Sequence, residues 1–135
     1  MKTFPLTIVT PDGVQFTGEA EELIVRAVSG DLGVMAGHTD LVTPLGMGRA
    51  TLVADGKKRY AACIGGILSV LDGKVKLVPT TFEWADAIDR ERAEAAEQRA
   101  RKTLDDHAAT SVELRLAEAR LKRSLVRQSV AQQAK

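Results

Sequence analysis

The composition of this chain changes abruptly near residue 85. All 11 glycines, all 4 prolines and every aromatic residue lie before that point, and alanine, arginine, glutamate and leucine dominate after it. Glycine and proline interrupt regular elements, whereas the residues of the second part are good helix formers. The chain therefore predicts an α+β protein, with a β-structured part over residues 1–84 and a helical part over residues 85–135.

Three Asp-Gly pairs punctuate the first part of the chain. Such a pair between two apolar runs favours a β-hairpin, because a type I′ turn requires φ > 0 at both central residues. Short apolar runs flank each pair, at intervals of about 8–12 residues, which is typical of a β-sandwich or a flattened barrel. The three pairs are Asp12-Gly13, Asp55-Gly56 and Asp72-Gly73.

The segment 29–46 concentrates four glycines among short apolar pairs. Glycine tolerates φ > 0 and lets two backbones approach closely, so the segment predicts tight bends between short strands at the corners of a sheet. Asp31 and His38 are the polar side chains presented there; His38 is either a contact to a partner or a satisfied structural histidine. The four glycines are Gly30, Gly33, Gly37 and Gly46.

Two apolar stripes at helical spacing follow Asp86. A polar link near residues 105–111 separates them, and Thr110 or Ser111 is expected to cap the second helix. Helices joined by so short a link should fold back antiparallel. The stripes are Ala93, Ala96, Ala100 and Leu104 in the first helix, and Leu114, Ala117, Leu121 and Leu125 in the second.

The first stripe consists mostly of alanine, which permits close approach but buries little apolar surface. This composition favours a weakly held hairpin that opens or docks elsewhere. The alternative is that the hairpin simply packs on the β-structured part.

Charge and motif content exclude several classes of function. The net charge of +1 gives no field for nucleic acid. No Ser-His-Asp arrangement, phosphate-binding glycine loop or Cys/His metal spacing is present. The pair Gly65-Gly66 is too short for a phosphate loop and predicts a bulge or a close backbone approach.

The single cysteine, Cys63, is expected to be a buried small hydrophobe. The chain contains no run of about 20 apolar residues, the length needed to span a membrane. Its first residues do not resemble a signal peptide. We therefore expect a chain in the cytosol or bound to something facing it.

Arginines are spaced along single faces of both predicted helices. Arg92 and Arg99 lie two turns apart, and Arg123 and Arg127 lie one turn apart. If the hairpin turns near residue 109, Arg92 lies opposite 123–127 and the guanidinium groups converge around an anion such as phosphate. The alternative is that these arginines point to water and pair with nearby glutamates. Those glutamates are Glu91, Glu94, Glu97 and Glu118.

The whole chain resembles the epsilon subunit of bacterial F-type ATP synthases. The run Gly-Asp-Leu-Gly-Val-Met-Ala-Gly-His-Thr-Asp-Leu-Val-Thr-Pro-Leu within 29–46 carries the likeness most specifically. The resemblance implies a ten-stranded β-sandwich followed by two helices. It also implies a central-stalk subunit that binds the gamma subunit and the c ring, with Asp31 at the c ring and His38 near gamma. The hairpin would restrain ATP hydrolysis when extended, reaching the alpha/beta head.

A narrower resemblance concerns nucleotide binding. Some bacterial members bind ATP through the pattern Ile/Leu-Asp-x-x-Arg-Ala, which Ile88-Asp89-Arg90-Glu91-Arg92-Ala93 matches in full. The family also uses a glutamate before the helix and further arginines. Trp84-Ala85 departs from the family pattern beside the motif. The ATP-binding residues that the resemblance implies are Glu83, Ile88, Asp89, Arg92, Ala93, Arg99, Arg123 and Arg127.

Three functions compete. The leading interpretation is a non-catalytic rotor subunit with a hairpin that senses ATP as a regulatory ligand, without a required cofactor. It would lie on the cytoplasmic face of the bacterial cell membrane and touch the membrane only through the complex. The second interpretation is a structural coupler that binds no nucleotide, and an ATP titration separates the two. The third, an enzyme on a β-sandwich, is opposed by the lack of any nucleophile–base pairing.

Overall fold

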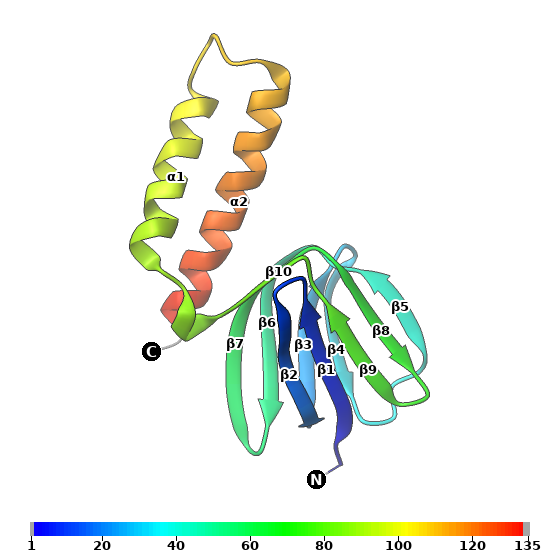
Figure 1. Ribbon diagram of the computed structural model, residues 1–135. Coiled ribbons are helices and arrows are strands. Elements are labelled where there is room, and N and C mark those ends of the chain that lie inside the picture. The colour runs from blue at the N-terminus through cyan, green and yellow to red at the C-terminus, as the bar shows by residue number, and fades with distance from the viewer. Residues whose placement is uncertain (1, 134–135) are drawn as a thin grey trace. The chain divides into compact units, whose positions relative to one another are not determined.

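The computed structural model describes residues 2–133. The chain divides into two compact units, Met1–Trp84 and Ala85–Lys135. The first unit is a sandwich of two five-stranded sheets, and the second is a pair of helices (Figure 1). The predicted α+β class is therefore confirmed.

Each sheet of the sandwich is mainly antiparallel. One parallel pairing, between β1 and β9, brings the first strand beside the ninth in the first sheet. The first sheet runs, in spatial order, β2 (Gly13–Ala20), β1 (Phe4–Thr10), β9 (Lys74–Val78), β8 (Ile67–Leu71) and β5 (Leu41–Pro44). The second runs β10 (Thr81–Trp84), β7 (Lys57–Ile64), β6 (Met47–Ala54), β3 (Glu22–Ala27) and β4 (Gly30–Met35).

The core lies between the two sheets because apolar residues recur at every second position of the strands. In β1, Phe4, Leu6 and Ile8 are buried, and in β8 Leu68 and Val70 are buried. This two-residue period is what a sheet with one covered face requires. Cys63 belongs to the same core, as expected, and burial raises the pKa of its thiol to about 12.

The Asp-Gly pairs all join neighbouring antiparallel strands, but with different turns. At Asp55 and Asp72 φ is +52° and +49°, and the following glycines are also positive, as a type I′ turn requires. Asp12 is not in that conformation; only Gly13 has positive φ. Here the prediction of a hairpin is confirmed and the inferred turn type is wrong, because Thr10 pairs with Gly13, so that Pro11 and Asp12 form the turn, and proline keeps φ negative.

Gly66 is a close backbone approach, as the sequence suggested. A Cβ at this position would lie 2.1 Å from the carbonyl oxygen of Val78, and φ is +97°. Any side chain would therefore collide with the neighbouring backbone.

The segment 29–46 forms β4, a turn, β5 and the residues that follow. His38 lies half-buried in the turn, with Nδ1 2.7 Å from the carbonyl oxygen of Thr39. Asp31 lies exposed on β4, where its carboxylate accepts from Arg26 at 3.1 Å. Both residues of the predicted subunit contacts thus lie on the sandwich.

The second unit begins with a short 3-10 turn, η1 (Ala85–Ala87), followed by helices α1 (Arg90–Leu104) and α2 (Ser111–Gln133). Asp89 caps α1, its side chain accepting from the backbone N–H of Arg92 at 3.0 Å. Thr110 caps α2 in a capping box: its hydroxyl accepts from Glu113 N, and the Glu113 carboxylate accepts from Thr110 N. The predicted cap is therefore confirmed, and the helices run side by side and antiparallel (Figure 1).

The predicted stripe on α2 is wrong at its last position. Leu125 is 42% exposed, whereas Ser124 is 1% exposed and its hydroxyl donates to the carbonyl of Leu121 at 2.8 Å. A helix repeats every 3.6 residues, so a series of four-residue steps drifts off the buried face and a three-residue step restores it.

Candidate functional site

A pocket of about 530 Å³ lies between α1 and α2. Among the residues that the structure describes, four arginines and four smaller side chains line it, and none of these is acidic. The lining residues are Ala96, Arg99, Ala100 and Thr103 from α1, with Ala117, Arg120, Arg123 and Arg127 from α2.

Helical spacing explains how the arginines gather. Arg120, Arg123 and Arg127 stand three and four residues apart, so they share one face of α2. Arg99 reaches the same space from α1, beside small alanines that leave room between the helices. The hydroxyl of Thr103 is engaged elsewhere, because it donates to the carbonyl of Arg99 at 3.2 Å.

Three of the four arginines that line the pocket have no polar partner for their side chains among the described residues 2–133. Among residues 2–133, no hydrogen bond or ion pair is made by the side chains of Arg99, Arg120 or Arg123. The alternative is therefore wrong in pairing Arg99 and Arg123 with the predicted glutamates, although Arg99 is exposed to water as that alternative expected. Clustered guanidinium groups repel one another, so the arrangement favours an anion with several oxygen acceptors.

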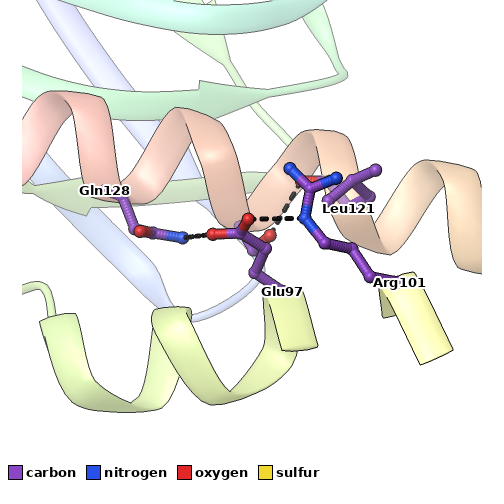
Figure 2. A network of polar contacts seen from close by, with 5 residues as sticks. Glu97, Arg101, Leu121 and Gln128 are labelled. Carbon is purple, nitrogen blue, oxygen red and sulfur yellow. Dashed lines mark hydrogen bonds and ion pairs between the residues drawn. The ribbon is translucent and has the colours of Figure 1, made fainter. Parts of the chain in front are cut away.

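Glu97, one of the glutamates expected to pair with these arginines, is held by other groups. Gln128 Nε2 donates to one of its carboxylate oxygens at 2.9 Å, and Arg101 Nε donates to the other at 2.7 Å. Figure 2 shows Glu97 between these two side chains. The hydrogen bond from Gln128 and that from Arg101 lower the pKa of Glu97, so it is a carboxylate at neutral pH. The carboxylate of Glu97 is thus engaged by Arg101 and Gln128.

The structure brings three of the predicted site residues into the pocket. Arg99, Arg123 and Arg127 line it, and Arg92 does not. The contact between Glu97 and Gln128 sets the register of the two helices, and Arg92 lies five residues before Glu97. Arg92 therefore lies level with the end of α2, nearly two turns beyond Arg127. The expectation that Arg92 faces 123–127 is corrected by this register.

The other predicted residues lie at the start of α1 or on the sandwich. Ile88 is half-buried just before α1, Asp89 caps the helix, and Ala93 is buried. Glu83 belongs to β10 of the sandwich unit. Its neighbour Trp84, which departs from the family pattern, has its ring covered by the Arg59 guanidinium at 3.6 Å.

Arg120 lines the pocket but was missed in the sequence. A signal was present, because Arg120, Arg123 and Arg127 form one helical face. Arg120 is not among the ATP-binding residues that the family resemblance implies, and the helix register inferred from the sequence gave no reason to add it.

The fold and pocket together define a class of protein: a β-sandwich with an appended helical hairpin that carries an arginine-rich anion pocket. Residues 3–85 match the family described as ATP synthase, Delta/Epsilon chain, beta-sandwich domain. The chain belongs to this ATP synthase delta/epsilon family.

Curated relatives extend the match to the helical unit. The ATP synthase epsilon chain of Bacillus velezensis is 41% identical over 131 residues, covering 97% of this chain and 98% of the relative. That of Bacillus subtilis is 43% identical over 108 residues, covering 80% and 82%. The similarity to epsilon chains therefore spans both units.

Two solved structures share the fold. A chain of the mitochondrial ATP synthase of Euglena gracilis, in an OSCP/F1/c-ring structure, has a TM-score of 0.83 at 23% identity and covers 94% of this chain and 80% of its own. A chain of the central stalk and c-ring of the Tetrahymena thermophila mitochondrial enzyme has a TM-score of 0.66 at 12% identity, covering 96% and 97%. Within residues 2–133, neither helix is long and apolar enough to cross a bilayer.

Proposed function

We propose that this chain is a non-catalytic rotor subunit of an F-type ATP synthase whose helical hairpin binds ATP as a regulatory ligand. The arginine-lined pocket between α1 and α2 carries the regulatory part of the proposal. The similarity to whole epsilon chains, and to chains of F1/c-ring and central-stalk structures, supports the rotor part.

In the assembly, the sandwich would bind the gamma subunit and the c ring, with Asp31 toward the ring and His38 toward gamma. Both residues lie in the segment 29–46 on the sandwich unit, where Asp31 is exposed and paired with Arg26 and His38 is half-buried. The extended hairpin would reach the alpha/beta head. The complex would place the chain at the cytoplasmic face of a bacterial cell membrane.

In the pocket, the arginines would take the triphosphate. Guanidinium groups suit this ligand because their planar forks donate two hydrogen bonds at once to phosphate oxygens. The nucleoside would extend toward the start of α1, where Ile88 offers an apolar surface and Asp89 an acceptor. Arg92 lies two turns, about 10 Å, from Arg99 along α1. This separation suits a ligand that extends beyond its phosphate groups.

Binding would hold the hairpin folded. The pocket takes its lining from both helices, so it exists only while α1 and α2 lie side by side. A ligand that binds one state better shifts the population toward that state. ATP would therefore oppose the extended state that restrains hydrolysis.

Calorimetric titration of the isolated chain with ATP tests this proposal. Arg123→Ala should weaken binding about ten- to a hundredfold, since each charged hydrogen bond contributes about 1.5–3 kcal/mol. The ATP affinity of Arg92→Ala tests in the same way whether the start of α1 takes part in binding. ADP should bind more weakly because it offers one phosphate fewer, and magnesium should matter little because arginines, not a metal, hold the phosphates.

Arg115→Ala is the matched control. Arg115 is an exposed arginine on α2 outside the pocket lining, so its loss should leave ATP affinity unchanged. If the parent chain gives no heat with millimolar ATP, the hairpin is no nucleotide sensor and the structural coupler is the better account.

A further inference from the structure

We infer that the hairpin pocket is a polyphosphate site in its own right, which binds an inorganic polyphosphate chain with no nucleoside attached, and that Arg120 is one of its ligands. The inference rests on the proposed function in placing phosphates in this pocket. It goes further in assigning Arg120 and in separating phosphate binding from nucleoside binding.

The first support is the division of residues between the pocket and the start of α1. The pocket lining contains only arginine, alanine and threonine. The residues suited to a base or ribose, Ile88 and Asp89, lie outside the lining. The part that recognises phosphate is therefore complete without the part that would recognise a nucleoside.

The second support is the state of the guanidinium groups. Arg99, Arg120 and Arg123 make no side-chain hydrogen bond or ion pair with any residue in 2–133. Each presents five N–H donors, and an arginine cannot lose its charge at neutral pH. A chain of phosphates brings several negative charges and many acceptor oxygens into one site, which meets these donors and offsets their mutual repulsion.

The third support is the position of Arg120. It precedes Arg123 by three residues, so among the lining residues of α2 it is, after Ala117, the one nearest the helical link, and Thr103 is the lining residue of α1 nearest that link. Arg120 therefore extends the row of Arg123 and Arg127 toward the link. A longer phosphate chain should use this extension, and a single phosphate should not.

The test titrates the full chain with inorganic tripolyphosphate, pyrophosphate and phosphate at low ionic strength. Affinity should rise with the number of phosphates and fall as salt is added, because Arg99 and Arg120 are exposed to solvent. Tripolyphosphate should also displace ATP. Arg120→Ala should weaken tripolyphosphate binding about three- to tenfold, a modest loss since the side chain is exposed.

Two further variants separate fork geometry from charge. Arg120→Lys keeps the charge but loses the bidentate fork, so its affinity should lie between those of the parent and Arg120→Ala. Arg115→Ala should match the parent. Helix content by circular dichroism should be the same in all variants, which shows that the helices remain formed.

The outcomes distinguish this inference from the proposed function. No binding of tripolyphosphate at millimolar concentration, or equal affinities for Arg120→Ala and Arg115→Ala, overturns the inference even when ATP binds. Tight tripolyphosphate binding with no binding of ATP supports the inference and overturns the nucleotide sensor.

Discussion

The sandwich and the hairpin bury very different side chains. The sandwich core contains large aliphatic and aromatic residues from both sheets, such as Phe4, Leu23 and Leu68. Within the described helical unit, the buried apolar residues are alanines together with Val130. A buried methylene contributes about 0.8 kcal/mol, so an alanine seam gains far less than a leucine core.

Under the proposed function, this difference would separate a platform, the sandwich, from a switch, the hairpin. A core of large residues gives one well-specified packing, whereas an alanine seam permits close approach with little to lose on separation. A ligand that bridges both helices can then make a large share of the energy that keeps them together. Under the proposed function, the thin seam and the arginine pocket would be two parts of one regulatory device.

The largest expected effect is on the sandwich core. Leu68→Ala removes a fully buried side chain between the sheets and should lower the free energy of unfolding by about 2–5 kcal/mol. Leu71→Ala is the control on the same strand, 54% exposed, and should change it by less than about 0.5 kcal/mol. Urea unfolding measures both, and similar values would contradict the assigned core.

A charge in the hairpin seam should act only on the hairpin. Leu121→Asp places a carboxylate at a half-buried position without a partner, which costs about 1–3 kcal/mol. Amide exchange in residues 90–130 should accelerate about ten- to a hundredfold, while sandwich amides stay protected. Leu125→Asp, at the exposed neighbouring position, should change little. Unaltered exchange in Leu121→Asp would show that this face does not pack.

Alkaline pH should destabilise the sandwich through Cys63. The unfolded thiol ionises above its usual pKa of 9.0, whereas the folded thiol keeps its proton to about 12. The folded state then binds more protons, so stability falls as pH rises above 9, by at most about 1.4 kcal/mol per pH unit. The measurement compares urea unfolding of the parent and Cys63→Ala at pH 9 and 10. Identical slopes would contradict the buried thiol.

Acid should loosen the hairpin through Glu97, with a smaller effect. Its folded pKa is lowered, so the stability that it adds is present above the usual pKa of 4.5 and is lost as pH falls through the folded value. Below about pH 4, the rate of amide exchange in α1 and α2 should increase less in Glu97→Gln than in the parent. Glu94→Gln, an exposed glutamate on the same helix, should behave as the parent does.

The smallest expected effect on the sandwich comes from removing the hairpin entirely. The core residues lie within residues 1–84, so that fragment should fold alone with nearly the parent's unfolding transition. It should also still bind the gamma subunit, because the segment 29–46 lies within it. An unfolded fragment, or a folded one that does not bind gamma, would contradict the separation of platform and switch.

Much of the fold could be predicted because it depends on local chemistry. Strands end at Trp84 and helices follow from Ala85 because glycine, proline and the aromatic residues stop there. The Asp55 and Asp72 turns take positive φ because an Asp-Gly pair tolerates it. The Thr110 cap follows from a hydroxyl three residues before a glutamate.

The candidate site could be predicted only in part, because its residues meet across two helices. Sequence spacing places Arg123 and Arg127 on one face of α2. The short link between the helices, however, does not fix the register of α1 against α2 to better than one helical turn. That register, set where Glu97 contacts Gln128, excludes Arg92 from the pocket and brings in Arg120.

The chain by itself therefore determined what each segment would become, since propensity, capping and alternation act over a few residues. Tertiary structure decided which distant residues meet, and it places Arg120 rather than Arg92 in the pocket. The physical reason is that packing fixes rotation and register jointly over a whole interface, and no local spacing contains that information.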